Sequence, residues 1–238
     1  MRIDTFTDVV DDCSLSALEG QLRLVDLTEA ERVGAGFQLD LAAGEFEFRG
    51  ESGERLTTRG HLIGTASPGD GTWLWAWHNL NDLPESAVRL AGRVRDFGRQ
   101  YRVPELTEAF QPLREGSRED AARYASVATV ICGGLPHYVF DAGNGTVVAV
   151  LLESERFRPG PPSVVRAATV IQQLLQQGAI RDWPRALASY AELRGFGHRP
   201  EADGAATLSA PDGHLTVSFD QLRRIASIKG QFKAAPEG

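Results

Sequence analysis

A run of tryptophans at alternate positions constrains the fold of this chain more than any other feature. Residues 72–79 read Thr-Trp-Leu-Trp-Ala-Trp-His-Asn, with indoles at Trp73, Trp75 and Trp77. In an extended strand, side chains two residues apart point to the same face. An indole buries about 150–250 Å², so three indoles on one face predict a strand that organises a hydrophobic core.

The composition is typical of a globular protein. The chain has 238 residues, of which 42% are hydrophobic and 24% charged, enough for one large domain or two small ones. Its longest uncharged stretch, residues 124–140, contains two glycines and a proline and is a poor bilayer span. We therefore expect no contact with a membrane.

Cysteine usage bears on the cellular compartment. Cys13 and Cys132 lie far apart in the sequence and form neither a Cys-x-x-Cys pair nor a dense framework. Both have apolar neighbours, so we expect small buried hydrophobes. The first residues lack the basic start and apolar run of a signal peptide. Together these features predict a cytoplasmic protein without a disulfide framework.

Charge is distributed unevenly along the chain. The formal net charge is −7, and residues 1–60, with 13 acids and 6 arginines, account for all of it. An acidic protein without a basic stripe repels phosphate backbones, which argues against a nucleic-acid partner. The acidic N-terminal segment predicts either a solvated face or a docking surface for a basic protein partner. No pattern indicates an oligomeric state.

The first two thirds of the chain alternate between a run of strands and a run of helices. Residues 3–33 have apolar side chains near helical spacing, and residues 37–78 switch to a period of two, which predicts a four-strand antiparallel meander. Helices are predicted from Pro84 and over residues 118–131. Residues 146–152 are apolar on both faces and predict a central strand.

A proline-rich segment, residues 159–162, is the best boundary between domains. We predict a main domain over 1–158 and a smaller module over 163–233. The module combines two helices with three short strands at 205–210, 214–219 and 224–229. Because strands and helices come in separate runs, the predicted class is α+β: an antiparallel sheet with helices on one face, plus the C-terminal helix–hairpin module.

The sequence contains none of the common signatures of catalysis or cofactor binding. The five histidines are isolated, without His-Glu-x-x-His or other ligand spacing, so no metal site is predicted. Phosphate-binding glycine loops and a Gly-x-Ser-x-Gly elbow are also absent. We predict no catalytic residue and no cofactor, and the balance favours a protein that is not an enzyme.

The tryptophan run allows two interpretations. In the first, the indoles of Trp73, Trp75 and Trp77 fill the interior and serve the fold. In the second they line an aromatic groove that stacks a planar or cationic ligand, with His78 and Asn79 at its rim because residues at strand ends often reach a pocket. These five residues are the candidate ligand-binding site.

The same region carries a resemblance to a known family. Leu62-Ile63-Gly64-Thr65, followed by the run from Gly71 to Asn79 and a helix that begins with proline, resembles an uncharacterised bacterial domain-of-unknown-function family. That family shows a Leu-Gly-Thr turn, a Trp-Leu-Trp-Ala-Trp-x-Asn strand and a later Tyr-Val-Phe hairpin. The resemblance covers residues 1 to about 155. It implies the fold and no activity, and His78 stands where the family usually has alanine.

Three hypotheses for function follow. The favoured one is a non-catalytic cytoplasmic binding or interaction protein, such as an immunity, chaperone-like or regulatory factor, that meets a partner through its acidic N-terminal surface. The second is a small-molecule or enzymatic pocket lined by the tryptophan strand. The third is a structural homodimer joined through a sheet edge.

Overall fold

The computed structural model describes residues 3–233 and confirms the α+β class, with six α-helices and two antiparallel sheets in that range. The chain forms two compact units. One joins Thr7–Glu19 to the chain from Gly160 onward, and the other contains Gly20–Pro159. Helix α1 (Phe6–Ala30) is continuous and contributes residues to both units, whereas the sequence placed it in the main domain alone. The end of the main domain at residue 158 and the start of the C-terminal module at residue 163 stay predictions.

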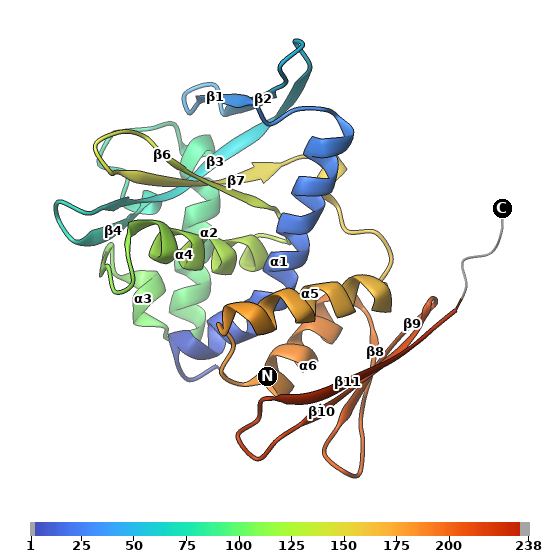
Figure 1. The fold of residues 1–238 in the computed structure, drawn as a ribbon. Helices are drawn as coiled ribbons and strands as arrows, with labels where there is room; N and C mark the ends of the chain where they lie inside the picture. Colours follow the sequence, from blue (N-terminus) through green and yellow to red (C-terminus); the bar gives the residue numbers. More distant parts are fainter. Residues whose placement is uncertain (1–2, 234–238) are drawn as a thin grey trace. The chain divides into compact units, whose positions relative to one another are not determined.

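The unit formed by Gly20–Pro159 contains a seven-stranded antiparallel sheet, in which the long strand β3 is central (Figure 1). β3 pairs with β2 and β4 along one edge and with β7 along the other. β7 is buried on both faces, as its apolar pattern predicted. The strands are β1 (Gly36–Asp40), β2 (Glu45–Arg49), β3 (Arg55–Ser67), β4 (Thr72–Trp75), β5 (Phe110–Pro112), β6 (His137–Asp141) and β7 (Val147–Glu153).

Helices and short turns complete this unit. Helix α2 packs on β3, and α4 packs on β3 and β7. Helix α3 is only four residues long, because the chain leaves it after Thr107 and forms β5 against β4. The elements are α2 (Glu85–Tyr101), α3 (Pro104–Thr107), α4 (Ser117–Ile131) and the 3₁₀ helices η1 (Ala76–His78) and η2 (Glu155–Phe157).

The seven-stranded sheet is curled into a half-barrel. Phe37 of β1 stacks on Phe46 of β2 with ring centroids 5.3 Å apart. The same ring contacts Tyr138 and Phe140 of β6, at 5.2 and 4.8 Å. β1 and β6 lie at opposite ends of the strand order, so these ring contacts require the sheet to curve until its two ends meet.

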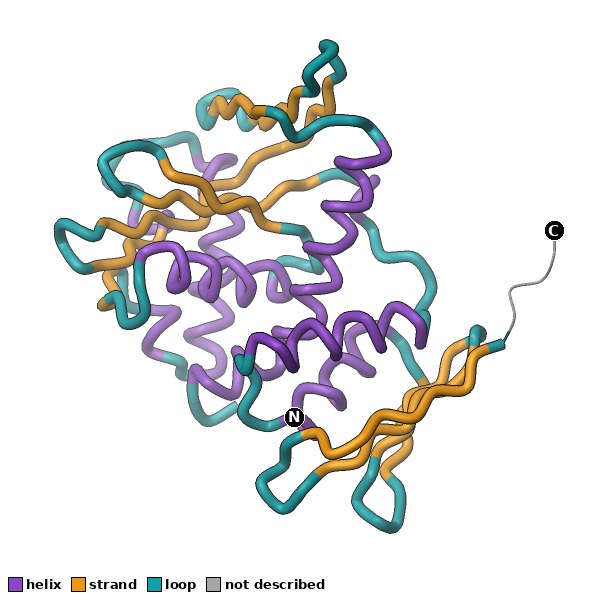
Figure 2. Tube along the Cα trace, viewed as in Figure 1, coloured by secondary structure: helices purple, strands orange, loops and turns teal. Residues whose placement is uncertain are grey.

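The second unit joins Thr7–Glu19 to the chain from Gly160 onward. It combines two further helices with a four-stranded antiparallel sheet of order β11-β10-β9-β8. Figure 2 shows its helices in purple and its strands in orange. Helix α5 packs against β9, β10 and β11, and α6 contacts β8, so the helices cover one face of the sheet. The elements are α5 (Val164–Gln177), α6 (Trp183–Arg194), β8 (Gly197–Pro200), β9 (Ala206–Ala210), β10 (Gly213–Phe219) and β11 (Ile225–Phe232).

Candidate functional site

Two of the predicted site residues lie in the hydrophobic core. Trp73 and Trp75 of β4 have 0% of their surface exposed. Their rings meet edge to face, 5.4 Å between centroids, and both contact Tyr124 of α4 at 5.2 Å. The indole Nε1–H of Trp75 donates to the carbonyl oxygen of Glu105, 2.9 Å away. These contacts agree with the first interpretation of the tryptophan run, in which the indoles serve the fold.

Trp77 and His78 lie outside the strand. The prediction of one strand carrying three indoles on one face is wrong for Trp77, because β4 ends at Trp75 and the chain continues as the 3₁₀ helix η1. The ring of Trp77 is covered by the guanidinium of Arg95, 5.4 Å from the ring centroid. His78 is exposed and meets Phe110 edge to face at 5.6 Å.

Asn79, the fifth predicted site residue, closes a turn. Its φ is 47°, a left-handed conformation that asparagine adopts more readily than most residues. Its side-chain amide donates to the carbonyl oxygen of Leu83 at 2.9 Å, and its side-chain oxygen accepts from the Leu83 amide at 3.0 Å. These two bonds hold the loop that leads into Pro84. The five residues do not line either of the two hollows described below, and their ligand binding stays a prediction.

Two histidines in the unit formed by Gly20–Pro159 are buried, and the ring of each has a hydrogen-bond partner. The ring of His61 lies 3.0 Å from the carbonyl oxygen of Ser86 through Nδ1 and 2.8 Å from the carboxylate of Glu153 through Nε2. Arg89 donates to the same carboxylate oxygen at 2.7 Å. Burial opposes the charge of Glu153, but these hydrogen bonds outweigh it and hold the pKa of Glu153 below its usual value.

The ring of the second buried histidine, His137, lies against a hydroxyl group. Its Nδ1 lies 3.0 Å from the Thr129 hydroxyl. Burial without a charged partner lowers the pKa of His137 to about 4, from an ordinary value of 6.5. The ring is therefore neutral at physiological pH.

This buried histidine predicts a loss of stability in mild acid. Between pH 6.5 and 5 the unfolded chain becomes almost fully protonated at His137 and the folded chain does not, so the free energy of unfolding should fall by about 1.5 kcal/mol. Urea unfolding of the wild type and of His137→Asn, measured at both pH values, separates the contribution of His137 from that of the other titrating groups. If both proteins lose the same free energy between the two pH values, His137 does not carry the effect.

The cysteines are buried as predicted, and burial raises the pKa of each thiol, for Cys132 to about 12. A thiol in that state is a poor nucleophile. Among residues 3–233, no group of three or more His, Cys, Asp or Glu side chains is arranged to hold a metal ion.

The acids of the N-terminal helix are engaged within the second unit. The carboxylate of Asp12 accepts two hydrogen bonds from the Arg185 guanidinium, at 2.6 and 2.8 Å. Asp11 accepts the backbone amides of Arg181 and Asp182, both at 3.1 Å, ahead of α6. Segment 7–19 is thus fixed to α6 by its acids. A protein partner on this acidic surface stays a prediction.

The outer face of the four-stranded sheet carries a hollow of about 470 Å³. Alternation places the apolar side chains Leu208, Leu215 and Val217 against the helices and small hydroxyl side chains on the opposite face. Thr207 of β9 pairs with Thr216 of β10 there, and their hydroxyls lie 3.0 Å apart. Longer side chains surround these two threonines, which makes the floor of the hollow lower than its rim.

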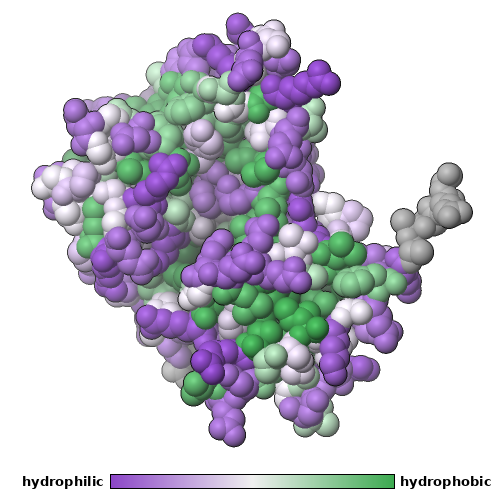
Figure 3. Space-filling model, viewed as in Figure 1, coloured by the Kyte–Doolittle hydropathy of each residue, from purple (hydrophilic) through white to green (hydrophobic). Residues whose placement is uncertain are grey.

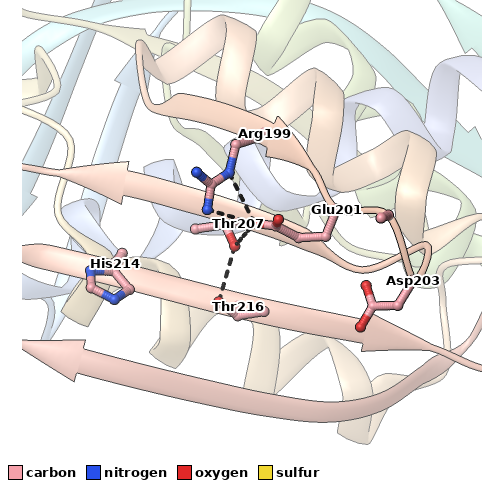
Figure 4. Close-up of a pocket in the computed structure, with 7 residues that line it drawn as sticks. Arg199, Glu201, Asp203, Thr207, His214 and Thr216 are labelled. Atoms are coloured by element: carbon pink, nitrogen blue, oxygen red, sulfur yellow. Dashed lines mark hydrogen bonds and ion pairs between the residues drawn. The ribbon is translucent and has the colours of Figure 1, made fainter.

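The rim of the hollow carries ionisable side chains of both kinds, acidic and basic. Figure 4 shows His214 at one end and Asp203 at the other, with Thr207 and Thr216 between them. Arg199 of β8 reaches over the middle and bonds to Glu201 at 2.9 Å. Glu201 also accepts the Thr207 hydroxyl at 2.8 Å, and hydrogen bonds from Thr207 and Arg199 lower its pKa. The hollow therefore offers donors and acceptors of both charges.

The sequence did not point to this hollow. Its residues come from β8, β9, β10 and the loop after β8, and no local motif joins them. β8 was not predicted, because Gly-His-Arg-Pro lacks apolar alternation. The one available signal was the alternation of His214 and Thr216 with buried Leu215 and Val217.

A second hollow, of about 340 Å³, lies in the other unit on strands β2, β3 and β7. Glu45, Arg59 and Glu153 face one another across these strands by register, and Thr57 and Ser154 also line the hollow. Glu153 already bonds to His61 and Arg89, so its carboxylate is committed to the fold.

Comparison with known proteins gives one assignment. No helix within residues 3–233 has the length and apolarity needed to cross a bilayer. Neither a curated protein nor a solved structure matches the chain. A model described as a family of unknown function, DUF6882, matches residues 7–155, more than half of the chain. The matched segment includes β1–β7 and ends before the sheet that carries the hollow of Figure 4. The chain belongs to the DUF6882 family.

Proposed function

We propose that this protein is a non-catalytic binding protein that holds a small dipolar ligand, such as an amino acid or a short peptide with free ends, on the outer face of the sheet β8–β11. The observation that carries the proposal is the hollow of about 470 Å³, which has His214 at one end, Asp203 at the other and the guanidinium of Arg199 between them. A ligand carboxylate would meet His214 and Arg199, and a ligand ammonium would meet Asp203. The Thr207 and Thr216 hydroxyls would bond to polar groups between them.

The Arg199–Glu201 pair supports this proposal because it is easily opened. The Arg199 side chain is 75% exposed, and an ion pair at such a site contributes about 0–1 kcal/mol. A ligand carboxylate can therefore take over the guanidinium at little cost. The exposed rim also lets a ligand enter without rearrangement of the strands.

The state of the reactive side chains supports a non-catalytic role. Both thiols are buried with raised pKa values, which suppresses the thiolate needed for nucleophilic attack. Both ring nitrogens of His61 have hydrogen-bond partners, and His137 is buried on the Thr129 hydroxyl. None of these groups lines the hollow on the second sheet.

Titration of the isotopically labelled full chain with alanyl-alanine at pH 7 tests the proposal. We expect amide shifts confined to the hollow around Thr207, His214 and Thr216. Arg199→Gln and Asp203→Asn should each raise the dissociation constant about tenfold, since each removes one charged partner, a loss of about 1.5 kcal/mol.

A matched control is Arg158→Gln. The Arg158 side chain is 76% exposed and pairs with Glu155 as Arg199 pairs with Glu201, but it lies in the other unit. It should leave binding unchanged. Glycerol and N-acetylalanine amide, which carry no charges, should bind at least tenfold more weakly. Equal responses to the charged and uncharged compounds, or no shifts in the hollow at millimolar dipeptide, would contradict the proposal.

A further inference from the structure

We infer that the open edge of β11 accepts an extended segment of another chain as an added strand, and that this segment alternates acidic with apolar residues. The inference concerns a different part of the sheet from the hollow and does not depend on ligand binding there. It is based on three features of β11: its unpaired main chain, the cations on one side and the apolar groups on the other.

The first feature is the open main chain. Within residues 3–233, β11 pairs only with β10, so one of its edges has no strand beside it. The amide of Lys233, just after β11, donates to the carbonyl oxygen of Asp212 on the β10 side. Because alternate residues of an antiparallel strand bond to the same neighbour, the N–H and C=O groups of Ile228, Gly230 and Phe232 face the open edge.

The second feature is a pair of lysines on the outer face. The chain contains 23 arginines and two lysines, and these two lysines are Lys229 and Lys233. Register opposite Thr216 places Lys229 on the outer face, and Lys233 follows at a spacing of four. Both are exposed, and neither has an ion pair with the residues that the structure describes. Two exposed ammonium groups at this spacing, without an ion pair to any of residues 3–233, favour carboxylates on alternate residues of an added strand.

The third feature is apolar surface on the inner face of the same edge. Ile228 pairs with the buried Val217 and is only half-buried itself. Phe232, on the same face, is 53% exposed. Figure 3 shows hydrophobic surface beside α5 within this unit. An added strand would cover this surface with the side chains that alternate with its carboxylates, which defines the amphipathic pattern.

The opposite edge of the sheet shows how an edge is closed to such pairing. β8 has four residues and ends at Pro200, and short length and proline are common ways to blunt an edge. β11 has eight residues and contains no proline. Its lysines disfavour pairing with a second copy of itself, because the ammonium groups of the two strands would then lie close together. The carboxylates of an added acidic strand would instead attract these ammonium groups.

The test uses the full chain and two eight-residue peptides capped at both ends, (Val-Glu)4 and (Val-Lys)4. By fluorescence anisotropy at low salt, we expect the acidic peptide to bind at least tenfold more tightly than the basic one. Amide hydrogen exchange in the complex should slow at Ile228, Gly230 and Phe232, since these groups would enter a ladder. The double variant Lys229→Glu, Lys233→Glu should reverse the preference between the peptides.

Arg199→Gln serves as the control, because it alters the hollow and leaves β11 unchanged. It should not affect peptide binding, so failure of the hollow and failure of the edge are separable. Acidic-peptide binding without slower exchange at the three amides would overturn strand addition. Equal affinity for the two peptides, no binding at millimolar peptide, or dimerisation of the free chain through this edge would also overturn the inference.

Discussion

Gly64→Ala is expected to destabilise the protein by about 3 kcal/mol, among the largest effects of any single added methyl group in the chain. Gly64 lies in β3 opposite Trp75, beside the register shift between Leu62 and Gly64. A Cβ at this position would stand 2.3 Å from Cζ2 of Trp73 and 2.5 Å from the carbonyl oxygen of Leu74. Neither group can withdraw, because the indole is fully buried and the carbonyl belongs to the strand β4.

Urea unfolding measures this effect, and Gly92→Ala is its control. A Cβ at Gly92, within α2, meets no atom within 4 Å, so alanine should stabilise the helix by about 0.5–1 kcal/mol. The double variant Gly64→Ala, Trp73→Leu should lose less than the sum of its single variants, since the smaller side chain relieves the clash. Additive losses would show that the contact with Trp73 is not the cause.

The packing of Gly64 against β4 also shows which part of the tryptophan pattern could be predicted from the sequence. Period two correctly predicted that Trp73 and Trp75 share a face. It could not reveal where β4 stops pairing, because that depends on its partner: pairing ends at Gly64, beside the irregularity in β3, and Trp77 then enters η1. A local pattern predicts a strand, but the end of the strand is set by residues more than ten positions away.

A similar limit applies to β7 and β8. The uninterrupted apolar run Val147–Leu152 predicted a central strand, since both faces of such a strand must be buried. β8 forms for the opposite reason. Its four residues are exposed, and the strand exists because its main chain completes the edge of β9, a cause that is absent from its own sequence.

The candidate site was beyond prediction for a related reason. The hollow depends on Thr207 and Thr216 being opposite each other, and on Arg199 crossing from a strand that was not predicted. Threonines in a strand usually indicate only that one face of the strand is exposed to solvent. Here they form the floor of a hollow, because the register places two small hydroxyl groups between longer charged side chains.

Loss of Glu19 should have the largest effect of all, about 3–5 kcal/mol, because it leaves the charge of Arg194 buried without its carboxylate partner. Glu19 of α1 accepts the Tyr190 hydroxyl at 2.8 Å and two hydrogen bonds from Arg194 of α6, at 2.6 and 3.0 Å. The side chains of Glu19 and Arg194 are 7% and 11% exposed. Glu19→Gln keeps the volume but removes the charge, and its unfolding midpoint in urea should fall sharply.

Two further variants separate the buried charge from simple loss of contacts. Glu155→Gln removes one partner of the surface pair with Arg158, in which both side chains are more than three-quarters exposed, and should change stability by less than about 1 kcal/mol. Glu19→Met, Arg194→Met should lose less than Glu19→Met alone, since the second change removes the unpaired guanidinium. If the double variant instead loses the sum of both singles, burial of the lone charge is not the origin of the effect. In that case packing, and not the buried ion pair, joins α1 to α6.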